Sequence, residues 1–328
     1  MAKEIGFPVI IKAAYGGGGR GMRIVEKESE FEELFRSATS EAEKFFGRGD
    51  VFIEKYVKNP RHIEIQIMAD KYGNVIHLGE RDCSIQRRHQ KVIEIAPSPR
   101  LSEEVRRELY RVAVKSMFKL GYENVGTLEF LVDENDNFYF IEMNTRLQVE
   151  HTVTETVTGV DIVQRMIQIA EGAKLPFLQE DIKFRGYAIE FRINAEDPKK
   201  GFAPSPGRIT SYYSPGGPGV RIDAAVYKDY IIPPYYDSMI AKLTVWALSW
   251  EQTVNRAKRA LEEFQVRGVP TNLPLLRQIV RDRDFLAGKF DTGYIDKKLP
   301  KLILKPEGGD PEDLATVIAA AIAAYHRL

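Results

Sequence analysis

One stretch constrains the fold of this chain more than any other, namely residues 126–151, which read GTLEFLVDENDNFYFIEMNTRLQVEH. Residues 125–132 and 138–144 are rich in β-branched and aromatic residues, and the turn-forming sequence DENDN separates them. This pattern predicts a β-hairpin. A hairpin centred on that turn places Glu129 opposite Glu142. Because like charges directly opposite each other destabilise an antiparallel pair, we expect a cation to bind between the two carboxylates.

Polar side chains recur at every second position from Glu142 onward, so an extended chain would project them to one side. They are Glu142, Asn144, Arg146, Gln148 and Glu150. The first two offer hard oxygen ligands that suit Mg²⁺, and the other three are suited to holding and activating a small anion. The alternative is a charged, solvated edge strand. It is disfavoured because the intervening residues are suited to burial, namely Tyr139, Ile141, Met143, Leu147 and Val149.

Composition excludes several classes of protein. The 328 residues suffice for about two domains, and 44% apolar with 29% charged residues is ordinary for a globular protein. Lys+Arg and Asp+Glu are both 47, so no global basic field favours nucleic acid. The single cysteine, Cys83, excludes an internal disulfide framework and favours a reducing compartment, so we predict a cytoplasmic protein. The longest apolar run, residues 314–325, is too short to span a membrane.

The glycine-rich run at residues 16–21, GGGGRG, satisfies a dinucleotide-binding pattern only because it is so rich in glycine. That pattern requires a helix after the glycines, whereas MRIV, a predicted strand, follows here. No Gly-Lys-Ser/Thr follows either, which excludes a Walker A loop. We therefore predict a glycine hairpin that folds its backbone N–H groups over phosphates as a lid. A floppy loop without a ligand remains the alternative.

The densest polar segment is residues 80–91, ERDCSIQRRHQK. Three of its bases and a histidine fall within five positions. A helix face of this composition would repel itself, so we predict that the segment lines an anion site. A solvated basic loop is the competing interpretation.

The remaining pattern alternates helices with short strands. Predicted helices occupy residues 27–46, 102–120, 161–171, 249–264, 272–280 and 311–328. Predicted strands in the second half occupy residues 187–194, 207–213, 219–226 and 239–246. The last helix is rich in alanine and has few long side chains, so we predict either a docking element or a partly frayed helix.

Several motifs together resemble the ATP-grasp family and, within it, the biotin carboxylases, over roughly residues 1–300. They are IIKAAYGGGGRGM, ERDCSIQRRHQKVIEIAP, FIEMNTRLQVEH, FRINAEDP with PSPG, and PPYYDSMIAKL. The resemblance implies an α+β chain with two ATP-grasp lobes that clasp ATP, followed by a biotin carboxylase C-terminal domain of antiparallel strands and helices. The expected divisions are a lid lobe at 1–57, a large lobe at 58–183, the C-terminal domain at 184–300, and a linker with a helix at 301–328.

The same resemblance implies roles for individual residues. The expected ATP contacts are Lys12, Gly16, Gly17, Gly18, Gly19, Glu54, Lys55, Tyr56, Val57, His62, Gln86, His89 and Leu131. The expected ligands of Mg²⁺ or Mn²⁺ are Glu129, Glu142 and Asn144. Bicarbonate is expected at Lys91, Arg146, Gln148 and Val149. Glu150 matches the general base, and Arg192 matches the arginine that faces the ureido oxygen of biotin.

The implied activity is carboxylation of biotin by bicarbonate through carboxyphosphate, the first half-reaction of acetyl-CoA, propionyl-CoA and pyruvate carboxylases. The implied partners are a biotin carboxyl carrier protein and a carboxyltransferase subunit, with a homodimer as the full-length form and no membrane or nucleic acid. The family's N-terminal domain, a nucleotide-binding lysine that follows it, and an AMKM-like biotinylation motif do not occur in this sequence. Three alternatives therefore stay open. They are a fragment or split subunit that needs the missing domain, another ATP-grasp ligase such as a carbamoyl-phosphate synthetase relative, and a non-catalytic binding module.

Overall fold

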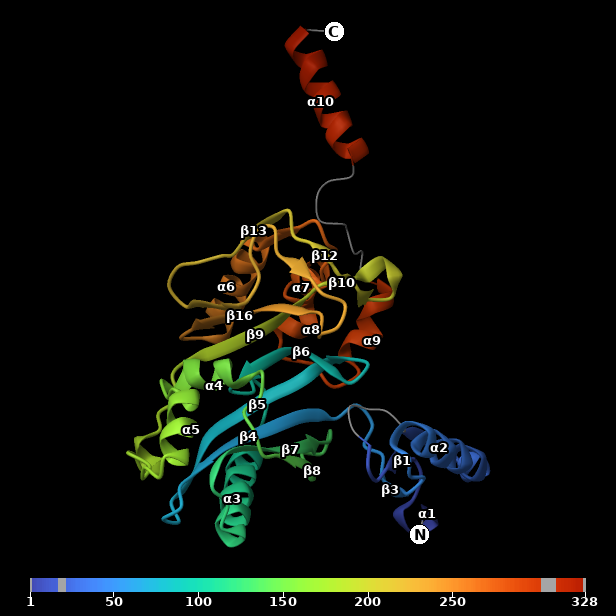
Figure 1. Ribbon diagram of the computed structural model, residues 1–328, viewed down its shortest axis with the longest axis vertical. Helices are drawn as coiled ribbons and strands as arrows, with labels where there is room; N and C mark the ends of the chain where they lie inside the picture. Colours follow the sequence, from blue (N-terminus) through green and yellow to red (C-terminus); the bar gives the residue numbers. More distant parts are fainter. Residues whose placement is uncertain (1, 17–21, 302–310, 327–328) are drawn as a thin grey trace.

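The chain begins with a small lobe built on a three-stranded antiparallel sheet (Figure 1). The computed structural model describes residues 2–16, 22–301 and 311–326. The sheet order is β2-β1-β3, with β1 at Val9–Ala13, β2 at Arg23–Val25 and β3 at Val51–Lys55. Helix α2, Phe31–Phe46, packs its apolar stripe on one side of this sheet. A short helix α1, Ala2–Ile5, and a 3₁₀ turn η1, Glu28–Glu30, complete the lobe.

An eight-stranded sheet forms the centre of the molecule, in the order β14-β16-β9-β6-β5-β4-β7-β8 with every neighbour antiparallel. Its strands are β4 Arg61–Ala69, β5 Val75–Arg87, β6 Gln90–Ala96, β7 Asn124–Val132, β8 Phe138–Asn144, β9 Tyr187–Asn194, β14 Val220–Ala224 and β16 Met239–Ala247. The sheet continues across the predicted boundary between residues 183 and 184, because β9 pairs with β6 on one side and with β16 on the other.

Helices cover the half of this sheet that contains β4, β5 and β7. Helix α3, Glu103–Leu120, packs on β4 and β5, and the Ser102 side chain caps it by accepting a hydrogen bond from the Val105 amide, as predicted. Helix α5, Ile162–Ala170, is capped by Asp161 and packs beside β7. Helix α4, His151–Thr158, lies over β5, β6 and β9 (Figure 1). It therefore carries the residues at its start to the middle of the sheet.

The other half of the sheet packs against the helices that follow β16. Helix α6, Trp250–Glu263, contacts β16 and β9, and α7, Leu273–Ile279, contacts β9. Helix α8, Arg283–Leu286, follows in the chain, and α9, Tyr294–Lys298, reaches β5. Short two-stranded sheets pair β10 Glu196–Asp197 with β11 Ala203–Pro204, β12 Gly207–Arg208 with β15 Ile231–Ile232, and β13 Ser211–Tyr213 with β17 Gln265–Arg267. Three further 3₁₀ turns are η2 Gln179–Asp181, η3 Pro198–Lys200 and η4 Leu299–Lys301. The buried residues of this half form the largest apolar core.

One predicted strand differs from the structure, and one competing interpretation is excluded by it. The single strand predicted at 207–213 is wrong, because the chain changes partner in the middle. The Ile209 amide donates to the Tyr230 carbonyl, while the Thr210 amide donates to the Arg267 carbonyl, so β12 and β13 belong to different sheets. The competing interpretation of residues 80–91, a solvated basic loop, is wrong, because the residues up to Arg87 continue β5 and are buried.

The last helix, α10 at Pro311–His326, extends away from the rest of the chain (Figure 1). Its exposed apolar side chains include Val317, Ile318, Ile322 and Tyr325. None of the helices in the described ranges is both long enough and apolar enough to cross a membrane.

Candidate active site

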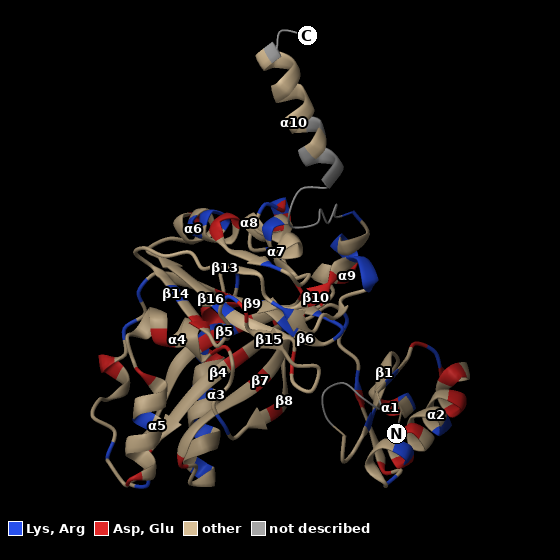
Figure 2. Ribbon diagram, turned by 45° about the horizontal axis from the view of Figure 1, so that its top comes forward, with Lys and Arg blue, Asp and Glu red and all other residues tan. Residues whose placement is uncertain are grey.

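A partly buried lysine, Lys91, forms the centre of a charged cluster on the eight-stranded sheet. The Lys91 ammonium on β6 contacts the Glu64 carboxylate, and its Nζ lies 2.8 Å from Glu150 Oε1 and 3.2 Å from Glu129 Oε1. Glu64 on β4 and Glu129 on β7 are direct cross-strand partners. Figure 2 shows charged residues on these central strands, inside the sheet. One cation therefore lies among three carboxylates, which is the arrangement that makes burial of such charges tolerable.

The charges in this cluster shift one another's pKa values. Burial by itself lowers the pKa of Lys91, but the Glu64 charge and then those of Glu150 and Glu129 outweigh it and raise that pKa. Burial by itself raises the pKa of Glu64, but the charges of Lys91 and Arg81 lower it to about 2. The pKa of Glu129 also falls to about 2, because a hydrogen bond from His62 and the nearby positive charges outweigh burial. These groups are therefore charged at neutral pH.

Arg81 on β5 lies at the buried side of the cluster, and its side chain is 0% exposed. Its guanidinium donates to Glu64 Oε2 at 3.0 Å and to Gln148 Oε1 at 3.0 Å. Its other partners are Gln66, Thr127 and Thr154. A guanidinium has five N–H donors in a rigid fork, and Arg81 makes five hydrogen bonds with them. It thereby ties strands β4 and β7 to the segment around helix α4.

Glu150 immediately precedes helix α4, and its carboxylate lies between two cations. One oxygen accepts from Lys91, and the other accepts from Arg192 Nη2 at 2.9 Å. The Arg192 Nε in turn donates to Glu94 Oε1 at 2.5 Å. Glu150 is 2% exposed, so both contacts form in a poorly hydrated setting. This geometry presents a base beside a fixed positive charge, which suits activation of a small anionic substrate.

The predicted pairing of Glu129 with Glu142 is confirmed by the register of β7 and β8. The Asn144 amide links them, with Nδ2 at 2.9 Å from Glu129 Oε1 and 3.3 Å from Glu142 Oε1. Two carboxylates and an amide oxygen at the end of one hairpin form a donor set suited to Mg²⁺. Because the N and O of an amide are assigned from hydrogen bonding, Asn144 can turn its oxygen toward a cation.

The extended path predicted beyond Asn144 is wrong. Strand β8 ends at Asn144, and the chain turns before α4, where the His151 amide donates to the Gln148 carbonyl. Gln148 and Glu150 nevertheless reach the cluster, and Gln148 Nε2 donates to Glu129 Oε1 at 3.0 Å. Arg146 reaches the hairpin side of the cluster, where it donates to Asn144 Oδ1 at 3.0 Å.

The intervening apolar residues are not buried as expected. Tyr139 is 42% exposed. The others are only partly buried, namely Ile141, Met143, Leu147 and Val149. For the three residues on β8, the reason is that this strand lies at the edge of the sheet.

Three predicted nucleotide contacts gather next to Glu129. His62 Nε2 lies 2.9 Å from Glu129 Oε2, and His62 Nδ1 lies 3.1 Å from Gln86 Nε2. Leu131 is the cross-strand neighbour of His62. His89 lies apart from them, exposed at the tip of the β5–β6 hairpin with a positive φ of 64°.

The predicted contacts in the small lobe occupy its own sheet. Lys12 on β1 forms an ion pair with Glu54 on β3. Lys55 Nζ donates to the Gly6 carbonyl at 2.7 Å, and the Tyr56 amide donates to the Pro8 carbonyl at 3.1 Å. Gly16 and Val57 are described, whereas Gly17, Gly18 and Gly19 lie outside the described residues.

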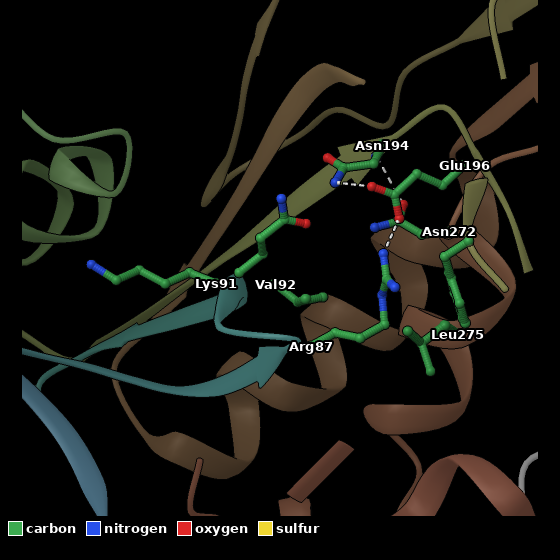
Figure 3. A pocket seen from close by; sticks show the side chains of 9 residues that line it. Arg87, Lys91, Val92, Asn194, Glu196, Asn272 and Leu275 are labelled. Carbon is green, nitrogen blue, oxygen red and sulfur yellow. Dashed lines mark hydrogen bonds and ion pairs between the residues drawn. The ribbon is translucent and has the colours of Figure 1, made fainter. Parts of the chain in front are cut away.

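The residues that line a pocket beside the cluster also hold the β5–β6 hairpin in place (Figure 3). Arg87 Nη2 donates to Glu196 Oε2 at 2.8 Å, and Asn194 Nδ2 donates to Glu196 Oε1 at 3.0 Å. Figure 3 shows the Lys91 side chain extending away from this pair. The Arg87–Glu196 ion pair therefore holds the hairpin against the residues that follow β9, while Lys91 contacts the carboxylates of the cluster.

Comparison with known proteins identifies the family. Residues 1–178 match the carbamoyl-phosphate synthase L chain, ATP binding domain, and residues 190–297 match the biotin carboxylase C-terminal domain. The whole chain is 56% identical to the 2-oxoglutarate carboxylase small subunit of Hydrogenobacter thermophilus and covers 69% of that subunit. This chain belongs to the biotin carboxylase family. The predicted family and the predicted α+β ATP-grasp fold class are thus confirmed.

Other family members support the same assignment. This chain is 52% identical to the chloroplastic biotin carboxylase of Arabidopsis thaliana. The match covers 97% of this chain and 58% of that protein's length. The biotin carboxylase domain dimer of the Hydrogenobacter enzyme, in complex with MgADP, ADP and bicarbonate, matches 93% of this chain and 67% of its own at a TM-score of 0.89 and 57% identity. A biotin carboxylase complex with beta-gamma-ATP from Campylobacter jejuni matches 90% of this chain and 66% of its own at a TM-score of 0.87 and 53% identity.

Sequence reasoning missed several residues that complete the cluster, namely Glu64, Arg81 and Glu94. Glu64 shares a face of β4 with His62, and that alternation was visible in the sequence. Arg81 and Glu94 gave no such signal, because their partners come from strands far away in the chain.

Proposed function

We propose that this chain carboxylates biotin with bicarbonate at the expense of ATP, as the first half-reaction of a biotin-dependent carboxylase. The observation that carries the proposal is the Glu150 carboxylate held between Lys91 and Arg192 and next to the Glu129–Asn144–Glu142 hairpin. A base, two cations that can bind an anion, and a set of hard oxygen ligands therefore lie next to one another. Support comes from the named relatives, one of which was crystallised with MgADP and bicarbonate.

In the proposed reaction, Lys91, Arg146, Gln148 and Val149 bind bicarbonate, and the Glu150 carboxylate accepts its proton. The bicarbonate oxygen attacks the γ-phosphorus of ATP, and ADP leaves as carboxyphosphate forms. The C–O bond of carboxyphosphate then breaks to give CO₂ and phosphate. Phosphate takes the N1′ proton of biotin, and that nitrogen bonds to CO₂. Arg192 stabilises the negative charge that develops on the ureido oxygen.

The remaining predicted residues serve ATP and the metal in this proposal. Glu129, Glu142 and Asn144 would hold Mg²⁺ or Mn²⁺, which supplies positive charge to the phosphoryl oxygens when bound. The nucleotide would lie between the small lobe and the His62 region. It would contact Lys12, Gly16, Gly17, Gly18, Gly19, Glu54, Lys55, Tyr56, Val57, His62, Gln86, His89 and Leu131. We also propose a cytoplasmic setting in which the enzyme works with a biotin carrier protein and a carboxyltransferase subunit, as a homodimer in its full-length form.

The proposal is tested by ADP release from MgATP and bicarbonate, with and without free biotin, using the 328-residue chain and a full-length relative as positive control. Biotin-stimulated release is expected from the wild-type chain. Glu150→Gln should lower it on the order of 100-fold or more, since a general base contributes that much. The matched control is Glu262→Gln. It removes the charge of an exposed glutamate on helix α6 that pairs with Arg281.

Two results would contradict the proposal. One is equal ADP release from Glu150→Gln and the control. The other is ADP release that requires bicarbonate but does not respond to biotin, which would favour an ATP-grasp ligase with a different acceptor.

A further inference from the structure

Beneath helix α4, strands β6, β9 and β16 carry a polar face whose opposite side is apolar core. Ile93, Ile189 and Phe191 point into that core. The alternate positions include ionic residues, and Glu94 on β6 is the direct cross-strand partner of Glu190 on β9. Both glutamates are 0% exposed. Directly opposed carboxylates have Cβ atoms only about 5 Å apart, so two full negative charges would repel strongly there.

Each of these glutamates uses one oxygen and leaves the other without a partner. Glu94 Oε1 accepts from Arg192 Nε, and Glu190 Oε2 accepts from the Thr152 hydroxyl. Glu94 Oε2 and Glu190 Oε1 are buried and have no hydrogen-bond partner within the part of the chain that is described. A buried acceptor left unsatisfied is costly. A proton on one carboxyl group would let the pair satisfy both orphaned oxygens at once.

The surrounding charges do not neutralise Glu190. Arg192 is shared between Glu94 and Glu150. Lys242 on β16 donates to the Val149 carbonyl, and its Nζ lies 3.5 Å from Asp223 Oδ2.

Lys91 is engaged by its own three carboxylates, and the buried Cys83 on β5 is a titratable neighbour of Glu94. Among the described residues, no basic side chain forms an ion pair with Glu190. Burial and then the charge of Glu94 raise the pKa of Glu190 well above its usual value. Burial raises the pKa of Glu94 to only about 7, since Arg192 opposes the effect.

We propose that Glu94 and Glu190 share one proton, which resides on Glu190, and that the ionised Glu94 is the positioning residue that orients Arg192 toward Glu150. Glu190 donates this proton to Glu94 Oε2, and Glu94 Oε1 binds Arg192 Nε. The Nη2 group is then left for Glu150. With Glu190 ionised, two carboxylates would compete with Glu150 for one guanidinium. This inference deepens the proposed function and rests on it for the role of Arg192.

The shared proton is tested by infrared spectroscopy of the full 328-residue chain at about pH 8, where an ordinary glutamate is fully ionised. We expect a protonated carboxyl absorption that shifts when all glutamate carboxyls are isotope-labelled. The band should persist in Glu262→Gln and disappear in Glu190→Gln. A wild-type spectrum without a label-sensitive protonated band would overturn the proposal, whether or not Glu190→Gln folds. So would a band that survives unchanged in folded Glu190→Gln.

The positioning role is tested with Glu94→Gln against Glu262→Gln. Losing a buried, charge-assisted hydrogen bond should lower kcat for biotin-dependent ADP release roughly 10- to 100-fold. The KM for ATP should stay within about twofold of the control, since Glu94 contacts none of the proposed nucleotide residues that the structure describes. Glu94→Asp, which keeps the charge, should recover part of kcat. Parallel changes in kcat and in KM for ATP would instead indicate a general structural role and would overturn the proposal.

A crystal structure of Glu94→Gln separates this inference from the proposed function. We expect Arg192 Nη2 to move out of hydrogen-bond distance of Glu150. An unmoved Arg192 overturns the positioning role. If the wild-type chain shows no biotin-dependent turnover, the proposed function fails, while the infrared band and this distance still decide the shared proton and the orientation of Arg192.

Discussion

The small lobe and the eight-stranded sheet hold the charged side chains of the candidate site in opposite ways. In the lobe, Lys12 pairs with Glu54, and the two side chains are 23% and 40% exposed. In the sheet, Arg81 pairs with Glu64 at 0% exposure for both. Exposed pairs contribute little to stability, whereas breaking a buried pair is strongly destabilising. The sheet is therefore a preorganised site, and the lobe presents side chains that a ligand can still rearrange.

The largest expected effect is on Arg81. Arg81→Met keeps much of the side-chain volume but removes five hydrogen bonds and leaves Glu64 with less compensation. We expect the free energy of unfolding to fall by about 3–5 kcal/mol, as for other broken buried pairs. Urea denaturation measures it. A loss below about 1 kcal/mol would show that the sheet tolerates its charges as well as the lobe does.

A smaller effect is expected from pH. The folded pKa of Glu64 is about 2, below its ordinary 4.5, so its ionised form stabilises the folded state. That contribution is complete above about pH 4.5 and is lost as pH falls toward 2, on the order of 3 kcal/mol in total. Glu64→Gln should therefore flatten the fall in unfolding free energy across this window, whereas Glu262→Gln should keep the wild-type slope. Equal slopes in all three proteins would remove Glu64 as the source.

The smallest expected effect on stability is in the lobe. Lys12→Ala breaks a partly exposed ion pair, so the free energy of unfolding should change by no more than about 1 kcal/mol. The same substitution should weaken ADP binding about tenfold, since the proposed function gives Lys12 a charged contact to phosphate. Calorimetric titration with MgADP measures the affinity. Strong destabilisation, or unchanged ADP affinity, would erase the contrast between the two regions.

The local part of the fold was predictable because its signals are local. The DENDN turn sets the register that pairs Glu129 with Glu142, and Ser102 caps its helix as expected. The alternation of polar residues after Asn144 led to a wrong prediction. It indicated an extended chain, whereas a turn leads from β8 into α4. The charged stretch that begins at Glu80 concealed a buried strand, since charge usually indicates exposure.

The site was predictable only in its motif residues. Glu94 and Glu190 meet across β6 and β9, and they lie almost a hundred positions apart in the sequence. Arg81 likewise reaches Gln148 from another strand. A single sequence shows no sign of such long-range partners, so the residues that orient the proposed catalytic groups emerge only from the fold.

The most direct test of the central claim follows the carbon atom. Isotope-labelled bicarbonate is supplied with MgATP and free biotin, and label in biotin is measured for the wild-type chain, Glu150→Gln and Glu262→Gln. A base at Glu150 between Lys91 and Arg192 predicts ATP-dependent labelling by the wild type and Glu262→Gln, with labelling lost in Glu150→Gln. Labelling that Glu150→Gln retains in full would contradict the account.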